Sequence, residues 1–264
     1  MNDSYEVFAV KYGQRIGKRG GMLIYGDPHD APMAMDYFVW AIRNEARTLV
    51  VDIGYSREDG ERRGREFLRC PTQGLAAVGV DAATVQDVII THMHYDHVGN
   101  LDKFPRARFH LQDSEMAYVT GRAVTHRRIR HSFTVDNVTD MVRMLYRDRV
   151  VFHDGDEAIA PGITVHHIGG HTRGLQVVRV NTARGQVVLA SDASHYYENM
   201  ETGEPFVVVD SITDMLEGHR RLFQLADSPA HVVPGHDPLV MQRYPAPSAQ
   251  LEGIAVRLDV APVA

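Results

Sequence analysis

Short apolar runs rich in β-branched and aromatic residues recur along the chain, bounded by glycine, proline or charged residues. This pattern is typical of buried strands. The segment 13–35 is rich in Gly, Pro and Asp and is expected to be a loop. We expect strands over residues 6–12, 37–43, 48–51, 88–90, 107–111, 163–168, 175–180, 186–190 and 230–233.

Helical spacing of apolar residues appears between these runs. The segment 113–149 interrupts the succession of strands and is mostly helical in its spacing. Ser211 is a favoured N-cap residue and is expected to begin a helix that ends near Leu225. Both halves of the chain run through strands and a helix into a strand that ends in a histidine-bearing loop, which predicts two similar layered halves in one domain. The other helices are expected over 60–68, 73–78 and 98–104.

Composition and charge narrow the class of protein. The 264 residues are 44% hydrophobic and 23% charged, as in an ordinary soluble globular protein. Cys70 is the only cysteine and no secretory signal or membrane span is visible, so we expect a cytoplasmic protein with no membrane partner. The net charge of −6 argues against a nucleic-acid partner.

Four metal-binding side chains fall within six positions, directly after the expected strand 88–90. They are His92, His94, Asp96 and His97. Imidazole nitrogen and carboxylate oxygen are ligands that zinc and similar first-row ions accept. In an extended chain His92 and His94 point to the same side and can bind one ion. A turn would then bring Asp96 and His97 to a second ion, so the sequence predicts part of a two-metal site.

Three more ligand-type residues follow apolar strands in the same way. His171 follows the strand 163–168, Asp192 follows 186–190, and His236 comes after the last short strand. We expect the four strand ends to gather at one edge of a sheet. Two acids and five imidazoles would be costly to bury there without a metal.

The chain has 15 histidines, and several are expected to have ordinary packed or surface roles. His126 and His131 lie five residues apart and do not share a helix face, so they are interpreted as structural or substrate-contacting residues. Ordinary roles are expected for His29, His110, His153, His166, His167, His219 and His231.

The segment His92-Met93-His94-Tyr95-Asp96-His97 matches the motif H-x-H-x-D-H and resembles the metallo-β-lactamase superfamily. His171, Asp192 and His236 follow in the order of that family's remaining ligands, and the resemblance covers roughly residues 37–236. It implies an α/β (α+β) fold, a four-layer αββα sandwich in a single domain over 1–264, with the metals at one sheet edge. The segment at about 113–149 would be a helical insert that forms the substrate pocket.

The resemblance also assigns a role to each candidate ligand. It implies two Zn²⁺ per chain, with Fe or Mn as alternative ions. Asp192 would bridge both ions, and Asp52 would brace the metal loops from behind the ligands. The first ion would be held by His92, His94 and His171, and the second by Asp96, His97 and His236.

Within the superfamily the chain is most similar to the N-acyl homoserine lactonase branch, through Asp192-Ala193-Ser194 and the helical insert. It departs from that branch at His195, where those lactonases place a tyrosine that hydrogen-bonds the lactone carbonyl. An imidazole could donate the same bond, so this departure leaves the acyl homoserine lactone substrate open. The bridging position carries no cysteine, so penicillin-type substrates are not expected.

These residues imply a dinuclear zinc hydrolase that opens a lactone ring by attack of a metal-bridging hydroxide. Asp96 or Asp192 could pass a proton to the leaving alkoxide, and Asp96 is the acid we expect, while His195 or Tyr196 stabilises the oxyanion. The partner would be a small-molecule lactone or ester, and a homodimer is one option for assembly. The alternatives are a thioester or phosphodiester hydrolase similar to glyoxalase II, an iron redox member, and a non-catalytic binding module.

The substrate pocket is expected to combine the insert 113–149 with the loop around 33–37. Arg122, His126 and the arginines that follow could pair with a substrate carboxylate, although a solvated helix face is the alternative. The methionine and aromatic candidates could equally be plain packing. The candidate contacts are Tyr37, Met116, Arg122, His126, Phe133, Met144 and Tyr197.

Overall fold

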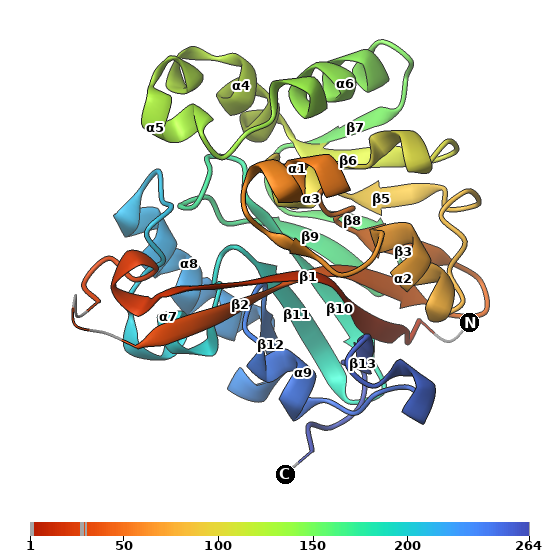
Figure 1. Ribbon diagram of the computed structural model, residues 1–264. Helices are drawn as coiled ribbons and strands as arrows, with labels where there is room; N and C mark the ends of the chain where they lie inside the picture. The colour runs from red at the N-terminus through yellow and green to blue at the C-terminus, as the bar shows by residue number, and fades with distance from the viewer. Residues whose placement is uncertain (1–2, 27–28, 30, 264) are drawn as a thin grey trace.

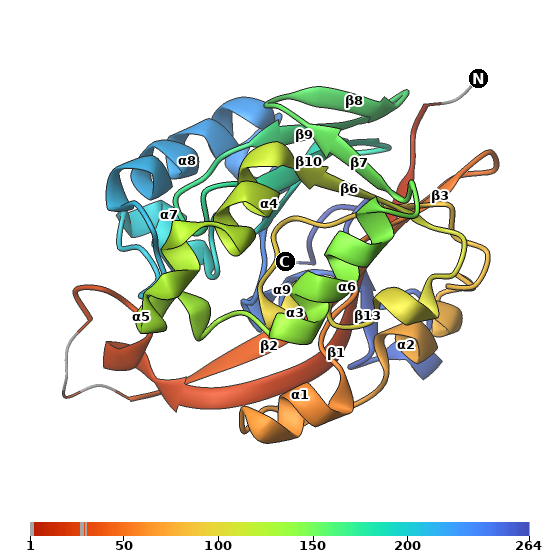
Figure 2. The same cartoon turned by 90° about the horizontal axis from the view of Figure 1, so that it is seen from above.

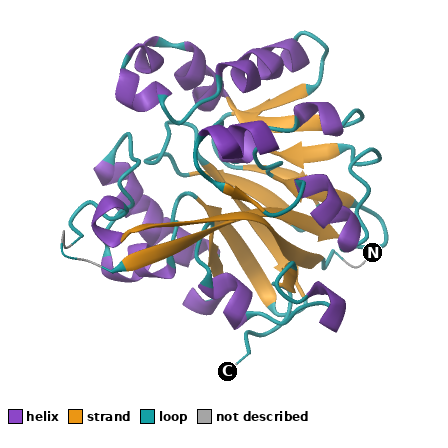
Figure 3. Cartoon of the chain, viewed as in Figure 1, coloured by secondary structure: helices purple, strands orange, loops and turns teal. Residues whose placement is uncertain are grey.

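The computed structural model describes residues 3–26, 29 and 31–263. Within these residues the strands form two sheets that pack face to face, with helices against both outer faces (Figure 1, Figure 3). This mixed α/β arrangement of two sheets and two helical layers confirms the fold class that the sequence implied.

The first sheet has the strand order β13-β1-β2-β3-β5-β6-β7, and β4 pairs with β1. A long antiparallel hairpin of β1 and β2 is followed by β3, β5 and β6, which run parallel to one another. The strands are β1 (Glu6–Lys18), β2 (Pro32–Arg43), β3 (Thr48–Val51), β4 (Glu66–Phe67), β5 (Asp87–Ile89), β6 (Arg108–Gln112), β7 (Val150–His153) and β13 (Ala255–Arg257).

The second sheet has the order β12-β11-β10-β9-β8. Because β11 is antiparallel to β10 and β10 to β9, the strands β9, β11 and β12 all point the same way and end at the same edge. The strands are β8 (Glu157–Ala160), β9 (Ile163–His167), β10 (Gln176–Thr182), β11 (Gly185–Ser191) and β12 (Val232–Pro234).

Short helices fill the connections. The predicted helix after Ser211 is α8, and the Ser211 hydroxyl accepts from the backbone N–H of Asp214 at 3.2 Å, as an N-cap does.

No helix in the described residues combines the length and the apolar character that a membrane span requires. The α-helices are α1 (Arg57–Arg62), α2 (Pro71–Ala77), α3 (Tyr95–Val98), α4 (Asp113–Thr120), α5 (Arg127–Arg130), α6 (Val135–Leu145), α7 (Tyr197–Thr202), α8 (Ile212–Leu225) and α9 (Leu239–Arg243), and the 3₁₀ turns are η1 (Arg19–Gly21), η2 (Leu101–Lys103), η3 (Arg122–Thr125), η4 (Pro229–His231) and η5 (Ala249–Leu251).

Side chains alternate between two apolar layers along the first sheet, as the pleat of a strand requires. On β1, Val7 and Ala9 belong to the core between the two sheets, whereas Phe8 and Val10 belong to the core under the helices. Trp40 on β2 is fully buried in the core between the sheets. Burial on both faces makes this sheet a rigid support for the loops at its ends.

The prediction of a loop over 13–35 is wrong at both ends of the segment, where 13–18 belongs to β1 and 32–35 to β2. The β1–β2 ladder continues from the pair Gly13 and Tyr37 to the pair Lys18 and Pro32. Gly13, one of the glycines that suggested a loop, allows close packing instead: a Cβ at this position would lie 2.0 Å from the Tyr55 hydroxyl. Positions 27, 28 and 30 of this segment lie outside the described residues.

Two helix predictions also need correction. The stretch predicted as a helix over 60–68 contains only the end of α1, because Glu66 and Phe67 pair with β1 as β4. The helix expected over 98–104 begins earlier, as α3, and is followed by the 3₁₀ turn η2. In both places charged and apolar residues at helical spacing belong to short turns, which periodicity alone does not distinguish from a longer helix.

We expected the four ligand-bearing strand ends at the edge of one sheet, but they belong to two sheets. Strand β5 belongs to the first sheet, whereas β9, β11 and β12 belong to the second, so the loops meet where both sheets end. Gln176 joins the sheets at this point, since its backbone N–H donates to Thr91 O at 3.0 Å and its side chain donates to Ile90 O at 2.9 Å.

A buried histidine in α8 gives the fold a testable pH dependence. Burial lowers the pKa of His219 to about 4, although the nearby backbone of Ala193 opposes the shift. In the unfolded chain the imidazole titrates near 6.5, so between about pH 6.5 and 4 only the unfolded state takes up this proton, and stability falls as the pH falls.

We predict that His219→Leu reduces this acid-dependent loss of stability by about 2–3 kcal/mol. The measurement is the free energy of urea unfolding of both proteins at pH 7 and pH 4.5. The half-buried His167 has its own partner, the Arg173 carbonyl, and His167→Leu is the matched control. An equal acid-dependent loss in wild type and His219→Leu would contradict the prediction.

Candidate metal centre

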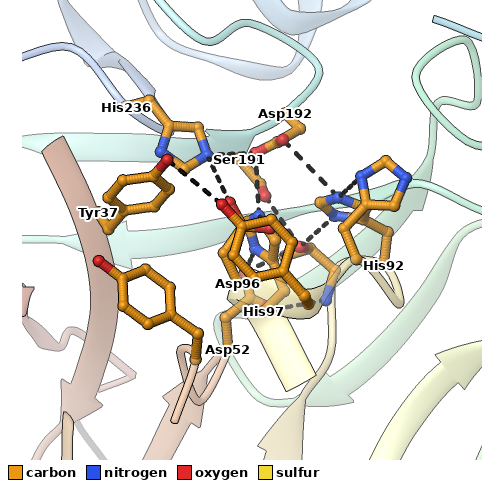
Figure 4. Close-up of polar contacts among 12 residues, drawn as sticks. Tyr37, Asp52, His92, Asp96, His97, Ser191, Asp192 and His236 are labelled. Atoms are coloured by element: carbon orange, nitrogen blue, oxygen red, sulfur yellow. Dashed lines mark hydrogen bonds and ion pairs between the residues drawn. The ribbon is translucent and has the colours of Figure 1, made fainter. Parts of the chain in front are cut away.

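Buried histidines and aspartates gather where the two sheets end. The ligand atoms of His92, His94, His171 and Asp192 lie within 4.8 Å of one another, and so do those of Asp96, His97 and His236. Figure 4 shows His92, His97, Asp192 and His236 pointing toward one another from separate elements. The structure thus brings together all seven residues that the sequence suggested as ligands.

The Asp192 carboxylate lies between the two groups. Its Oδ2 is 3.1 Å from His171 Nε2 and 3.7 Å from His92 Nε2. Its Oδ1 is 3.0 Å from His236 Nε2 and 3.3 Å from His97 Nε2. Each oxygen therefore faces a different group, which is the arrangement that a carboxylate shared by two cations requires.

Hydrogen bonds on the far side of the imidazoles fix their orientation. His171 Nδ1 lies 2.7 Å from Val208 O, and His236 Nδ1 lies 2.8 Å from Asp36 O. A carbonyl oxygen only accepts, so each Nδ1 carries the proton and each Nε2 presents a lone pair to the cluster. These rings are held in the tautomer that binds a metal.

Asp52 performs the same task for His97. Its carboxylate accepts from His97 Nδ1 at 2.7 Å and from the backbone N–H and hydroxyl of Thr91, both at 2.8 Å. The φ of Asp52 is +56°, in the left-handed region that is uncommon for residues other than glycine. The surrounding contacts hold this conformation at the end of β3, and Asp52 joins the loop after β5 to the first sheet.

The donor set fits metal ions. His94 Nδ1 lies 3.0 Å from His92 Nε2 and 2.9 Å from His171 Nε2, and the outer hydrogen bond of His171 leaves that nitrogen without a proton. Among the described residues, the buried Nε2 of His97 has no hydrogen-bond partner. Converging lone pairs repel each other unless a cation lies between them, and these nitrogen and oxygen donors are the ones that Zn²⁺ binds.

The pKa shifts within the cluster also fit a metal site. Burial lowers the pKa of His92 and His94 well below the usual range, and the neighbouring imidazoles add to the effect, so both rings are neutral. Burial would raise the pKa of Asp192, but the surrounding imidazoles outweigh it and hold that pKa well below its usual range. Metal ligands must be in these deprotonated forms.

His97 and His236 differ from His92 and His94. Burial opposes protonation of His236, yet the carboxylates of Asp192 and Asp96 raise its pKa above the usual range. Burial also opposes protonation of His97, yet the carboxylates of Asp192, Asp52 and Asp96 outweigh burial and raise its pKa well above the usual range. The same carboxylates create a potential that favours positive charge at the inward nitrogen of this ring. A divalent cation would satisfy that potential directly.

Sequence analysis did not identify Glu115, which is fully buried at the start of α4. Its carboxylate accepts from the backbone N–H of Met93 at 2.8 Å, from the Thr172 hydroxyl at 2.7 Å and from the backbone N–H of Gly174 at 3.0 Å. It therefore joins the loop of His92 and His94 to the loop of His171. One glutamate in a helical segment carries no signal that separates it from a solvated acid.

The two residues proposed to stabilise an oxyanion lie in different surroundings. His195 is buried against the cluster, with Nε2 3.0 Å from Asp192 Oδ2 and its ring stacked on Phe206 at 3.7 Å between centroids. Burial lowers its pKa to about 3, so the ring is neutral. The Tyr196 hydroxyl instead lies 3.1 Å from Ala34 O and from the sulfur of Met22.

Of the candidate substrate contacts, Tyr37 and Phe133 lie beside the cluster. The Tyr37 ring is edge-on to His236 with centroids 5.2 Å apart, and the Phe133 ring lies 4.7 Å from that of His94. Arg122 and His126 are exposed at η3 and just before α5. The remaining three pack in the apolar cores: Met116, Met144 and Tyr197.

The histidines expected to have ordinary roles have no ligand atom in these groups. His110 Nδ1 faces His153 Nε2 at 3.0 Å, and the outer nitrogens of this pair meet carboxylates of Asp87 and Glu157. His166 pairs with Asp156 at 2.8 Å. His131 lines a cavity close to Phe133.

Comparison with known proteins agrees with this geometry. The family model of the metallo-beta-lactamase superfamily matches residues 35–252. The chain belongs to the metallo-beta-lactamase superfamily. The match includes all seven candidate ligands and most of both sheets.

Relatives with lactonase names are about a quarter identical to the chain over the regions that match. An N-acyl homoserine lactonase from Bacillus sp is 28% identical over 138 residues, which is 52% of this chain and 50% of the relative. The lactonase AttM from Azorhizobium caulinodans is 29% identical over 179 residues, 66% of each chain. The matched region spans about half the length of the Bacillus relatives.

Solved structures of lactonases share the fold of this chain. A quorum-quenching N-acyl homoserine lactone lactonase superposes with a TM-score of 0.74 at 20% identity, covering 90% of this chain and 94% of the other. An N-acyl homoserine lactone hydrolase with the product N-hexanoyl-L-homoserine at its catalytic metal centre has a TM-score of 0.75 at 19% identity, covering 92% and 96%.

Glu115 provides a test of how the centre is held. In Glu115→Gln, one amide oxygen replaces two carboxylate oxygens that accept three hydrogen bonds, so at least one buried donor loses its partner. We predict a metal affinity about ten- to a hundredfold weaker and a stability about 1–3 kcal/mol lower. Competition with a chromogenic chelator and thermal unfolding are the measurements.

The matched control is Glu217→Gln, because Glu217 lies on the exposed side of α8 and, among the described residues, its side chain pairs with Arg220 alone. This control should leave metal affinity unchanged. Wild-type affinity in Glu115→Gln would show that the hydrogen bonds of Glu115 do not position the ligands.

Proposed function

We propose that the protein is a dinuclear zinc-dependent hydrolase that opens the ring of a small-molecule lactone. The observation that carries this proposal is the position of Asp192, with one carboxylate oxygen toward each group of ligand atoms. The similarity to lactonases in sequence and fold supports the choice of a cyclic ester as substrate.

In this proposal the ligands divide into two sets that share Asp192. His92, His94 and His171 hold one ion, and Asp96, His97 and His236 hold the other. Two divalent ions bound there supply a hydroxide nucleophile at neutral pH and polarise an ester carbonyl. Zinc is the proposed ion because it prefers histidine ligands. Fe and Mn also accept nitrogen and oxygen donors and are the alternatives.

The proposed reaction adds one water across the ring ester bond. The water oxygen bonds to the carbonyl carbon, the bond from that carbon to the ring oxygen breaks, and the ring oxygen takes a proton, which gives a hydroxy acid. Asp96 is the proposed carrier of this proton. It is 9% exposed, whereas the other six proposed ligands are 5% exposed or less, so its carboxylate is the one best placed to exchange a proton with solvent.

His195 is the proposed donor to the oxygen that becomes negative during attack. Its buried Nδ1 has no hydrogen-bond partner among the described residues, while the Tyr196 hydroxyl is within hydrogen-bond distance of Ala34 and Met22. We therefore assign the role to His195 rather than to Tyr196. We further propose that residues 1–264 form one domain, in which the segment 113–149 is the insert beside the substrate.

The experiment combines a substrate panel with Asp96→Asn in the zinc-loaded protein. We expect hydrolysis of γ-lactones or aryl lactones, and a loss of about 10²–10⁴-fold in kcat for Asp96→Asn, since an amide cannot carry the proton. The control Asp214→Asn changes an exposed acid in the first turn of α8 and should keep full activity.

The panel also includes S-lactoylglutathione and bis-p-nitrophenyl phosphate. Turnover of only the thioester or only the phosphodiester would replace the lactonase proposal by one of these alternatives. Full lactone turnover after exhaustive chelation would overturn the metal-dependent mechanism.

A further inference from the structure

A cavity of about 760 Å³ next to the candidate metal centre is lined by five arginines together with valines and Phe133. It lies between α1 and the segment from α5 to α6, which cover the same end of the molecule in Figure 2. Three of the arginines come from the segment after β3 and two come from α5. They are Arg62, Arg63, Arg65, Arg127 and Arg130.

This positive charge is not neutralised within the cavity. Asp136 is the one acid among the lining residues, and Arg62 is paired with Asp59 beside the cavity. Arg127 and Arg130 are exposed, and their side chains have no hydrogen bond or ion pair with the part of the chain that the structure describes. In a chain of net charge −6, such a concentration of unpaired guanidinium groups favours an anionic ligand.

The cavity shares a wall with the metal centre. Phe133 lines the cavity, and its ring lies 4.7 Å from the ring of His94. Arg65 donates from Nε to the Tyr95 hydroxyl at 3.0 Å, and Tyr95 lies between the candidate ligands His94 and Asp96. The side chain of Phe133 is therefore the one that lies between the cavity and the ring of His94.

Part of the arginine cluster is held in place before any ligand binds. Arg63 donates to His131 O at 2.8 Å and to Phe133 O at 3.1 Å, and its guanidinium lies 4.1 Å from the centre of the Tyr95 ring. Arg65 in turn donates to Arg63 O at 2.9 Å. These contacts fix one side of the cavity, while Arg127 and Arg130 remain available on the other.

We propose that this cavity binds an anionic group of the substrate, a carboxylate or a phosphate, so that the enzyme prefers lactones or esters that carry a negative charge. This inference rests on the proposed hydrolase function. Planar guanidinium groups pair with such anions through two parallel hydrogen bonds. A plain alkyl chain would instead cover unpaired charges, which is unfavourable.

The test compares p-nitrophenyl esters of the same length with different ends: a carboxylate, a phosphate and a neutral methyl amide. We expect kcat/KM about tenfold or more higher for at least one anionic ester than for the neutral ester. We also expect this preference to weaken as salt is raised, since the arginines are exposed. The better anion identifies which group the cavity takes.

The variants are Arg127→Gln, Arg130→Gln and the double variant. Each is expected to lower the ratio of anionic to neutral kcat/KM, about tenfold for the double variant, mainly through KM. Arg128→Gln is the matched control, because Arg128 is an exposed residue of the same helix that does not line the cavity. It should leave the ratio unchanged.

The outcomes separate this inference from the proposed function. Hydrolysis of all three esters with no preference, or a preference that the double variant retains, overturns the inference and leaves the hydrolase standing. If neither these esters nor the lactones of the panel are hydrolysed, the hydrolase proposal fails. If the esters alone are not hydrolysed, calorimetric titration with glutarate tests the cavity directly. Binding that is lost in the double variant but kept in Arg128→Gln supports an anion site, and absence of binding overturns it.

Discussion

The structure depends on one buried carboxylate, Asp192, that lies among imidazoles at the end of two sheets. A charge this deeply buried is unfavourable unless positive partners surround it. Its two oxygens face different groups of ligand atoms, so it links them. The preceding residue, Ser191, has a φ of +44°, and the backbone carbonyl of Ser191 would lie 2.6 Å from a Cβ on Gly235. The backbone here is shaped to bring the loops of Asp192 and His236 close together.

Around this carboxylate, the rest of the site is a set of outer hydrogen bonds that fix each ring. Asp52 orients His97, backbone carbonyls orient His171 and His236, and Glu115 joins two ligand loops. The ligands come from both sheets, so the packing of the sandwich itself sets the distances between them. This explains why a buried apolar core on both faces of the first sheet matters for chemistry at its end.

Much of the metal centre could be predicted from sequence because its signal is local. His92, His94, Asp96 and His97 share one loop, and each remaining ligand follows an apolar strand, so residue type and order were sufficient. The N-cap at Ser211 was predictable for the same reason. Glu115 and the arginine cavity were not, because they depend on contacts between distant segments: Arg63 and Arg65 meet Phe133 and Tyr95 only in the fold. The strand pairing at the two ends of 13–35 was missed because Gly13, Gly17 and Pro32, which suggested a loop, occupy paired positions in a ladder.

The central claim is that Asp192 lies between two cations, and anomalous diffraction from crystals of the zinc-loaded protein tests it most directly. Two zinc peaks per chain, one on each side of the Asp192 carboxylate and each next to its own group of histidines, are the predicted result. A single peak, or peaks remote from Asp192, would contradict the account.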